Sequence, residues 1–123
     1  MDIRQKIEAA WEDRNLLEDK AYSQVVEEAV AALNAGDLRV AQPEDGEWQV
    51  NEWVKKAVIL YFPLQKMTTS HAGPLEFHDK IPLKSGYSAM QVRVVPHAVA
   101  RYGSFLSKDV VMMPSYVNIG AYV

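Results

Sequence analysis

Cysteine is missing from all 123 residues of the chain. Its absence excludes disulfide bonds, thiolate metal sites and cysteine nucleophiles. No run approaches the ~18 apolar residues that a membrane helix needs, and the charged start MDIRQKIEAAWEDR is unlike a signal peptide. We therefore expect a cytoplasmic protein that has no membrane partner.

An excess of basic residues is missing as well. The net charge is -3 at pH 7, whereas nucleic-acid-binding domains carry a basic stripe, so we expect no nucleic-acid partner. The three histidines, His71, His78 and His97, follow no zinc-binding spacing, and no metal site is predicted. The motifs of P-loop NTPases, Rossmann enzymes and serine hydrolases do not occur.

The residues that are present predict helices in the first part of the chain. Asp2 and Gln5 have the spacing of a capping box, and apolar residues at helical spacing continue from there to Trp11. The same spacing predicts a longer helix from Asp19 to Leu33. Gly36 is expected to end that helix, because glycine adopts the left-handed conformation without a Cβ clash.

A hairpin and a third helix are predicted next. Residues 38–42 and 47–50 alternate apolar and polar side chains, and the turn-forming residues Pro43 to Gly46 separate them. Asn51 is placed to cap the following helix through its side chain. Pro63 is expected to end that helix.

The middle of the chain has little periodicity. Residues 65–75 are rich in Thr, Ser, Gly and Pro and are predicted to form a loop. Residues 76–89 are interpreted as an irregular linker with room for one short strand. We therefore expect residues 1–90 to form a helical N-terminal domain with a hairpin and linker, and residues 91–123 to begin a second domain.

The end of the chain repeats every six residues. Read from Val95, the hexads are VPHAVA, RYGSFL, SKDVVM, MPSYVN and IGAYV. Their fifth residues are all apolar, which marks them as the predicted buried positions: Val99, Phe105, Val111, Val117 and Val123. Such a period predicts a parallel β-helix with about 18 residues per coil, and hence the α+β class. Because the repeat is still running at Val123, we expect the chain to be the front portion of a longer β-helical enzyme.

Arg93 is the candidate binding residue. It lies between Val92 and Val94, directly before the hexads. The planar guanidinium suits a carboxylate in two-point contact. The alternative is an outward-facing strand residue with its head in water, and spacing alone leaves both interpretations open.

Several motifs together resemble the tetrahydrodipicolinate N-succinyltransferase family of bacterial lysine (diaminopimelate) biosynthesis. The most specific are MPSYVNIGAYV at 113–123 and NEWVKKAV at 51–58. The others, in chain order, are ALNAGDLRVA at 32–41, DGEW at 45–48, DKIPLK at 79–84 and RVVP at 93–96.

The resemblance implies a homotrimer of left-handed parallel β-helices, each with a small helical N-terminal domain. It implies transfer of a succinyl group from succinyl-CoA, a cosubstrate and not a tightly bound cofactor, to the amine of a ring-opened dicarboxylate. The arginine of RVVP contacts the substrate in that family, which makes Arg93 the expected substrate-binding residue. The family's acidic catalytic residues and coenzyme A groove lie in later coils, so no catalytic residue is expected here.

Two departures and two alternatives accompany the resemblance. Residues 67–75 differ from the family's usual loop, and Val92 stands where an aromatic residue is common. An acetyl donor could replace the succinyl donor. Alternatively, the chain is a non-catalytic oligomerisation or binding module derived from the front of the enzyme. In either case we expect residues 1–123 alone to lack a complete active site and to be inactive.

Overall fold

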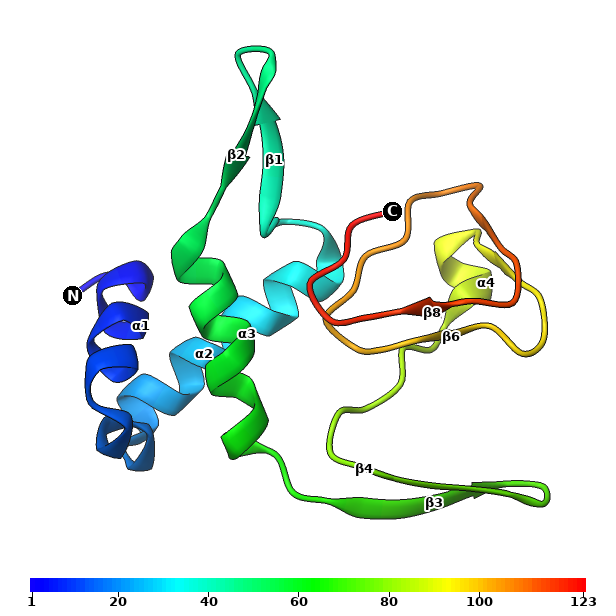
Figure 1. The fold of residues 1–123 in the computed structure, drawn as a ribbon, viewed down its shortest axis with the longest axis horizontal. Coiled ribbons are helices and arrows are strands. Elements are labelled where there is room, and N and C mark those ends of the chain that lie inside the picture. The colour runs from blue at the N-terminus through cyan, green and yellow to red at the C-terminus, as the bar shows by residue number, and fades with distance from the viewer.

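The computed structural model describes residues 1–123, which form a mixture of helices and short strands. The elements in chain order are α1 (Ile3–Glu12), the 3-10 helix η1 (Arg14–Glu18), α2 (Lys20–Ala35), β1 (Ala41–Glu44), β2 (Glu47–Val50), α3 (Glu52–Leu64), β3 (Thr68–Ala72), β4 (Leu75–Asp79), α4 (Tyr87–Met90), β5 (Arg93–Val94), β6 (Val99–Ala100), β7 (Val111–Met112) and β8 (Tyr116–Val117). The long helices gather on one side and the last strands wind on the other (Figure 1). The α+β class is confirmed, and none of the helices combines the length and apolar character needed to cross a bilayer.

Two predicted helix signals are confirmed: the capping box at the start of α1 and the glycine that ends α2. Gln5 N donates to Asp2 Oδ1 at 2.8 Å, and Asp2 N donates to Gln5 Oε1 at 2.9 Å, which completes the capping box. Gly36 adopts φ +82° after α2, as a left-handed helix end requires. A Cβ at Gly36 would also lie 2.6 Å from the Phe105 ring, so this glycine allows the end of α2 to approach the C-terminal strands.

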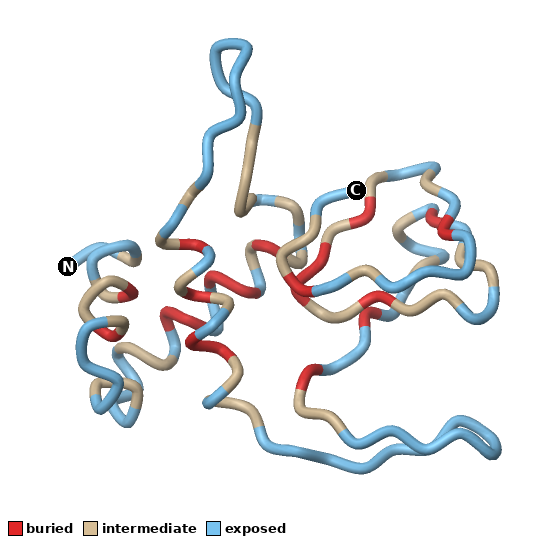
Figure 2. Tube along the Cα trace, in the orientation of Figure 1, coloured by how far each residue is buried: buried red, intermediate tan, exposed pale blue.

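The main core lies among α1, α2 and α3. Ile7, Val26, Val30 and Leu60 are completely buried, and Ile119 joins this cluster from the far end of the chain. Each such side chain contributes roughly 1.5–3 kcal/mol of transfer free energy. Figure 2 shows these buried positions along the crossing helices, with exposed residues along both hairpins.

The first hairpin is present, but its turn differs from the prediction. Glu44 pairs with Glu47, so the turn is only Asp45–Gly46, with φ +51° and +82°. Positive φ at both positions fits a type I′ turn, whose twist matches the flanking strands. Pro43 is therefore not a turn residue: it lies in β1 opposite Trp48, on a two-stranded sheet where a missing N–H is tolerated.

The boundaries of α3 also differ in detail. Asn51 occupies the N-cap position, but its side chain makes no capping bond. Its Nδ2 instead donates to Arg39 O at 2.8 Å and to Gln42 Oε1 at 3.1 Å, which ties the hairpin to the helix. Pro63 lies inside the last turn, and the helix ends one residue later, at Leu64.

The loop predicted for residues 65–75 is wrong from Thr68 onward, where β3 begins. β3 and β4 form an antiparallel hairpin in which Thr68 pairs with Asp79 and Ala72 with Leu75, across a Gly73–Pro74 turn. Threonine and aromatic residues favour strands, and the Gly73 φ of +61° permits the tight connection. The hairpin extends away from the helices, and nearly all of it is exposed (Figures 1 and 2).

Residues 91–123, which we call the parallel-strand segment, pair in parallel. Arg93 pairs with Val111 and Val99 with Tyr116, and a further parallel bridge joins Phe105 to Tyr122. A second, smaller core lies inside the segment, formed by four buried residues: Val92, Ala100, Leu106 and Met112.

The predicted phase of the hexads is wrong by one residue in the first three hexads, whereas in the fourth the predicted Val117 packs against the inner core and the sixth residue, Asn118, is exposed. The sixth positions Ala100, Leu106 and Met112 are buried, whereas Val111 and Val123, at fifth positions, are 49% and 48% exposed. The other fifth positions, Val99, Phe105 and Val117, are only half-buried. Successive strand residues point to opposite faces, so moving the inward position by one residue exchanges the inner and outer faces.

Candidate functional site

Arg93 lies on the outside of the parallel-strand segment. Its backbone N–H donates to Val110 O at 3.0 Å within β5, which fixes the position of the residue. Val92 before it is buried and Val94 after it is half-buried, so the strand is anchored on both sides. The guanidinium itself is exposed and takes part in none of the side-chain hydrogen bonds or ion pairs of the structure. It is a free cation on a fixed backbone.

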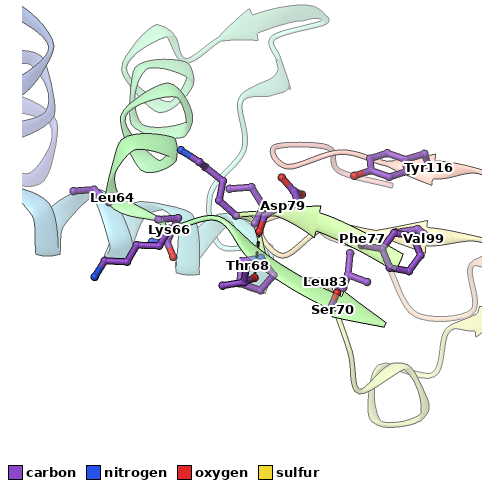
Figure 3. Close-up of a pocket in the computed structure, with 13 residues that line it drawn as sticks. Leu64, Lys66, Thr68, Ser70, Phe77, Asp79, Leu83, Val99 and Tyr116 are labelled. Carbon is purple, nitrogen blue, oxygen red and sulfur yellow. Dashed lines mark hydrogen bonds between the residues drawn. The ribbon is translucent and has the colours of Figure 1, made fainter. Parts of the chain in front are cut away.

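A cavity of about 710 Å³ lies elsewhere, between the β3–β4 hairpin and the parallel-strand segment. Its lining comes from the end of α3, from both hairpin strands, from residues 79–83, and from β6 and β8 (Figure 3). Phe77, Leu83, Val99 and Tyr116 are among its apolar lining residues. Arg93 is not among the lining residues.

The Arg101–Asp79 ion pair fixes the end of the β3–β4 hairpin beside this cavity. Arg101 Nη2 donates to Asp79 Oδ2 at 2.9 Å, and Arg101 Nη1 donates to Asn118 Oδ1 at 3.3 Å. The guanidinium carbon lies 5.8 Å from the Phe62 ring centroid and 5.9 Å from that of Tyr116. The carboxylate of Asp79 is thus neutralised, whereas Lys66 and Lys80, which also line the cavity, have no acidic partner within 4.0 Å.

A buried lysine joins the helices to the parallel-strand segment. Lys84 is 7% exposed, and its Nζ donates to Asn34 O at 3.0 Å and to Asn34 Oδ1 at 2.8 Å. The same Oδ1 accepts from Gly103 N at 3.0 Å. No carboxylate pairs with the ammonium, and burial lowers the pKa of Lys84. This contact is structural and fixes the end of α2 against the strands.

The histidines lie at the surface. Thr69 Oγ1 and His78 Nδ1 are 2.8 Å apart, and His71 Nε2 lies 3.1 Å from Glu76 Oε1, all on one face of the β3–β4 hairpin. His97 is exposed near the start of the hexads. No group of three His, Cys, Asp or Glu side chains is placed to hold a metal ion.

Four residues that form or line these contacts were not predicted from the sequence, where only a weak pattern marks them. Asp79, Lys80 and Lys84 all lie in DKIPLK, which drew attention only as a motif of resemblance. Arg101 opens the second hexad, where a charged residue interrupts an apolar repeat. Their roles depend on partners that are distant in the sequence, and spacing alone does not reveal such partners.

The geometry first defines a class: an α+β protein whose last strands pair in parallel and present an exposed, unpaired guanidinium at Arg93. Residues 2–64 match the family described as "Tetrahydrodipicolinate N-succinyltransferase N-terminal". The chain belongs to the tetrahydrodipicolinate N-succinyltransferase family.

Curated relatives extend the similarity along nearly the whole chain. The chain is 48% identical over 132 residues to the 2,3,4,5-tetrahydropyridine-2,6-dicarboxylate N-succinyltransferase of Paraburkholderia phytofirmans, covering 98% of this chain and 48% of the relative. The enzyme of the same name from Ralstonia pickettii is 49% identical over 130 residues, covering 97% of this chain and 47% of the relative. The chain therefore spans about half the length of the curated relatives it matches, and corresponds to their N-terminal portion.

Proposed function

We propose that residues 1–123 are the N-terminal portion of an enzyme that transfers a succinyl group from succinyl-CoA to tetrahydrodipicolinate. The observation that carries the proposal is 48% identity along 98% of the chain to an N-succinyltransferase for that dicarboxylate. The reaction would serve lysine biosynthesis in the cytoplasm. Succinyl-CoA would act as a cosubstrate, with no tightly bound cofactor.

The proposed architecture divides the chain near residue 90. Residues 1–90 would form the helical N-terminal domain, and residues 91–123 would begin a left-handed parallel β-helix. The parallel pairing of Arg93 with Val111 supports this, because its offset equals the roughly 18 residues of one β-helical coil.

We further propose that the enzyme is a homotrimer. Val111 and Met113 are 49% and 62% exposed on the outside of the parallel-strand segment. Large apolar side chains gathered on an outer surface favour burial by another subunit.

Arg93 is proposed to bind one carboxylate of the substrate. Its exposed guanidinium carries no competing ion pair, and the ladder of β5 and β7 fixes its backbone. A hydrogen bond to a charged group contributes roughly 1.5–3 kcal/mol. A two-point contact with Arg93 would therefore place the dicarboxylate against the outer face of the strand.

No catalytic residue is proposed within residues 1–123. The relatives are about twice as long, and the transfer step is assigned to their remaining half. We expect the purified 123-residue chain, mixed with succinyl-CoA and the dicarboxylate, to release no coenzyme A. Turnover by this chain alone would overturn that assignment.

A chimera tests the function directly. Residues 1–123 would replace the matching portion of the Paraburkholderia phytofirmans enzyme, in cells that lack N-succinyltransferase activity. We expect growth without added diaminopimelate, and coenzyme A release by the purified chimera. A chimera that is folded by circular dichroism and still inactive would contradict the proposal.

The role of Arg93 is tested in the same chimera. Arg93→Lys keeps the charge but loses the planar fork, so we expect the KM for the dicarboxylate to rise about tenfold or more, with the fold unchanged. Lys108→Gln, at another exposed cation of the segment, is the matched control and should leave the KM unaltered. Wild-type kinetics in Arg93→Lys would make Arg93 an ordinary solvent-facing residue.

A further inference from the structure

The cavity between the β3–β4 hairpin and the parallel-strand segment has the size of a ligand site. Its volume of about 710 Å³ falls within the roughly 300–1,000 Å³ typical of small-molecule pockets. Three large side chains on its walls remain well exposed: Phe77 at 45%, Leu83 at 56% and Tyr116 at 58%. An apolar body placed among them would remove this surface from water, which is favourable at roughly 25 cal/mol per Å².

One face of the β3–β4 hairpin lines this cavity. Ser70 and its partner Phe77 line it, as do Thr68 and Asp79. The alternate positions carry two polar pairs, Thr69–His78 and His71–Glu76. Within each pair, the two side chains hydrogen-bond across the hairpin. Because successive strand residues point to opposite faces, the polar pairs face away from the cavity. The cavity wall therefore follows from the strand register.

The charges around the cavity are unbalanced. Lys66 and Lys80 lack acidic partners, whereas Asp79, the acid in the lining, is already bound by Arg101. The hydroxyl of Ser70 makes no hydrogen bond in the structure and adds a free donor beside Phe77 (Figure 3). An occupant with a negative head would be complementary to this rim.

We propose that this cavity binds a small amphipathic anion, with an aromatic or aliphatic body against Phe77, Leu83 and Tyr116 and an acidic head near Lys80. The proposal goes beyond the role given to Arg93, which does not line the cavity. Apolar contact supplies affinity, and the unpaired lysines supply the preference for an acidic head.

Two fluorescent probes that differ in the acidic head test the proposal on the 123-residue chain. The anion 1-anilinonaphthalene-8-sulfonate and the neutral N-phenyl-1-naphthylamine share an aromatic body. We expect the sulfonate to saturate one site and to bind about tenfold more tightly than the neutral probe. Equal affinity for the two probes would overturn the proposal.

Variants locate the site. Phe77→Ser should weaken both probes about fivefold or more, and Lys80→Gln should weaken only the sulfonate. Ile59→Ser and Lys108→Gln remove an exposed apolar side chain and an exposed cation elsewhere, so both should bind like the wild type. Phe77 is half-exposed, so its loss leaves the cores intact, and circular dichroism checks this.

Two further results would refute the assignment. One is sulfonate binding that neither Phe77→Ser nor Lys80→Gln changes. The other is a wild-type oligomer, seen by light scattering, that Phe77→Ser dissociates, because a second copy would then fill the cavity. Arg93 is untouched in all these variants, so failure here leaves the dicarboxylate proposal standing.

Discussion

The helical part and the parallel-strand segment are stabilised in different ways. The core centred on α1, α2 and α3 contains eleven buried residues, nine of them from these helices, whereas the core inside the segment contains four. The helices also close their own ends, through the Asp2–Gln5 box and the Gly36 turn. The strands of the segment are only two residues long, so they depend on contacts outside themselves.

Those contacts lead back to the helices. Lys84 and Gly103 both bond to Asn34 at the end of α2, Ile119 enters the helical core, and the Phe105 ring lies against Gly36. The helical part is therefore the platform on which the segment is held. Stability should therefore fall most when the platform is damaged, less when the junction is damaged, and least where only one polar contact changes.

The largest effect is expected from Leu60→Ala. Leu60 is completely buried in the helical core, and such truncations cost about 2–5 kcal/mol of unfolding free energy through lost transfer energy and a residual cavity. Urea denaturation followed by far-ultraviolet circular dichroism measures the loss. Leu106→Ala removes an equal side chain from the smaller core and should cost about 2 kcal/mol, at the low end of that range. A greater loss for Leu106→Ala than for Leu60→Ala would contradict the assignment of the main stabilising core to the helices.

A middle-sized effect is expected from Gly103→Ala at the junction. Gly103 has φ +94°, and a Cβ there would lie 2.6 Å from Ile119 Cγ1 and 3.1 Å from Val30 Cγ1. We expect a loss of about 2–3 kcal/mol from backbone strain and displaced packing together. Hydrogen exchange should show the parallel-strand segment losing protection before α2 and α3.

Gly46→Ala is the matched control for Gly103→Ala. Gly46 has φ +82°, and a Cβ there would meet nothing within 4 Å, so the substitution reports backbone strain alone, at about 1 kcal/mol. Equal losses for the two alanines would mean that Gly103 does not hold the segment against the helices.

Local signals predicted the helical part well. The Asp2–Gln5 box and Gly36 act within a few residues, so the sequence alone reveals them. The β3–β4 hairpin was missed because Thr68 and Thr69 belong to a segment whose Ser, Gly and Pro are typical of loops. Its pairing across Gly73 adds a constraint that composition does not contain.

The hexads show a different limit. Fifth and sixth positions are both apolar in three hexads, as in Phe105–Leu106 and Val111–Met112. The period is therefore readable from the sequence, but its phase is not, and only packing decides which residue points inward. In the same way Arg93 could be singled out from its neighbours, whereas the cavity near Lys80 could not, because its walls come from four separate stretches of chain.

The smallest effect is expected from Lys84→Met at neutral pH. Methionine removes a buried ammonium and its two bonds to Asn34, while Asn34 Oδ1 keeps the bond from Gly103 N. Asn34 O loses its donor from Lys84, which is destabilising, but the desolvation cost of the ammonium is removed at the same time. Because the two effects oppose each other, we expect a net change below about 1 kcal/mol at pH 7.

The pH dependence of the unfolding free energy tests whether the Lys84 ammonium is buried. Burial lowers the pKa of Lys84 in the folded state below the usual 10.5, so between these two pKa values the unfolded chain holds more protons than the folded one. Stability must then rise with pH across that window, because the desolvation cost of the charged lysine disappears as it is neutralised. Wild type should therefore gain unfolding free energy relative to Lys84→Met as the pH increases toward 10.5, measured by urea denaturation at each pH. A difference between the two proteins that stays constant across the window would mean that the ammonium is hydrated, and that the junction is more open to water than the contacts of Lys84 with Asn34 imply.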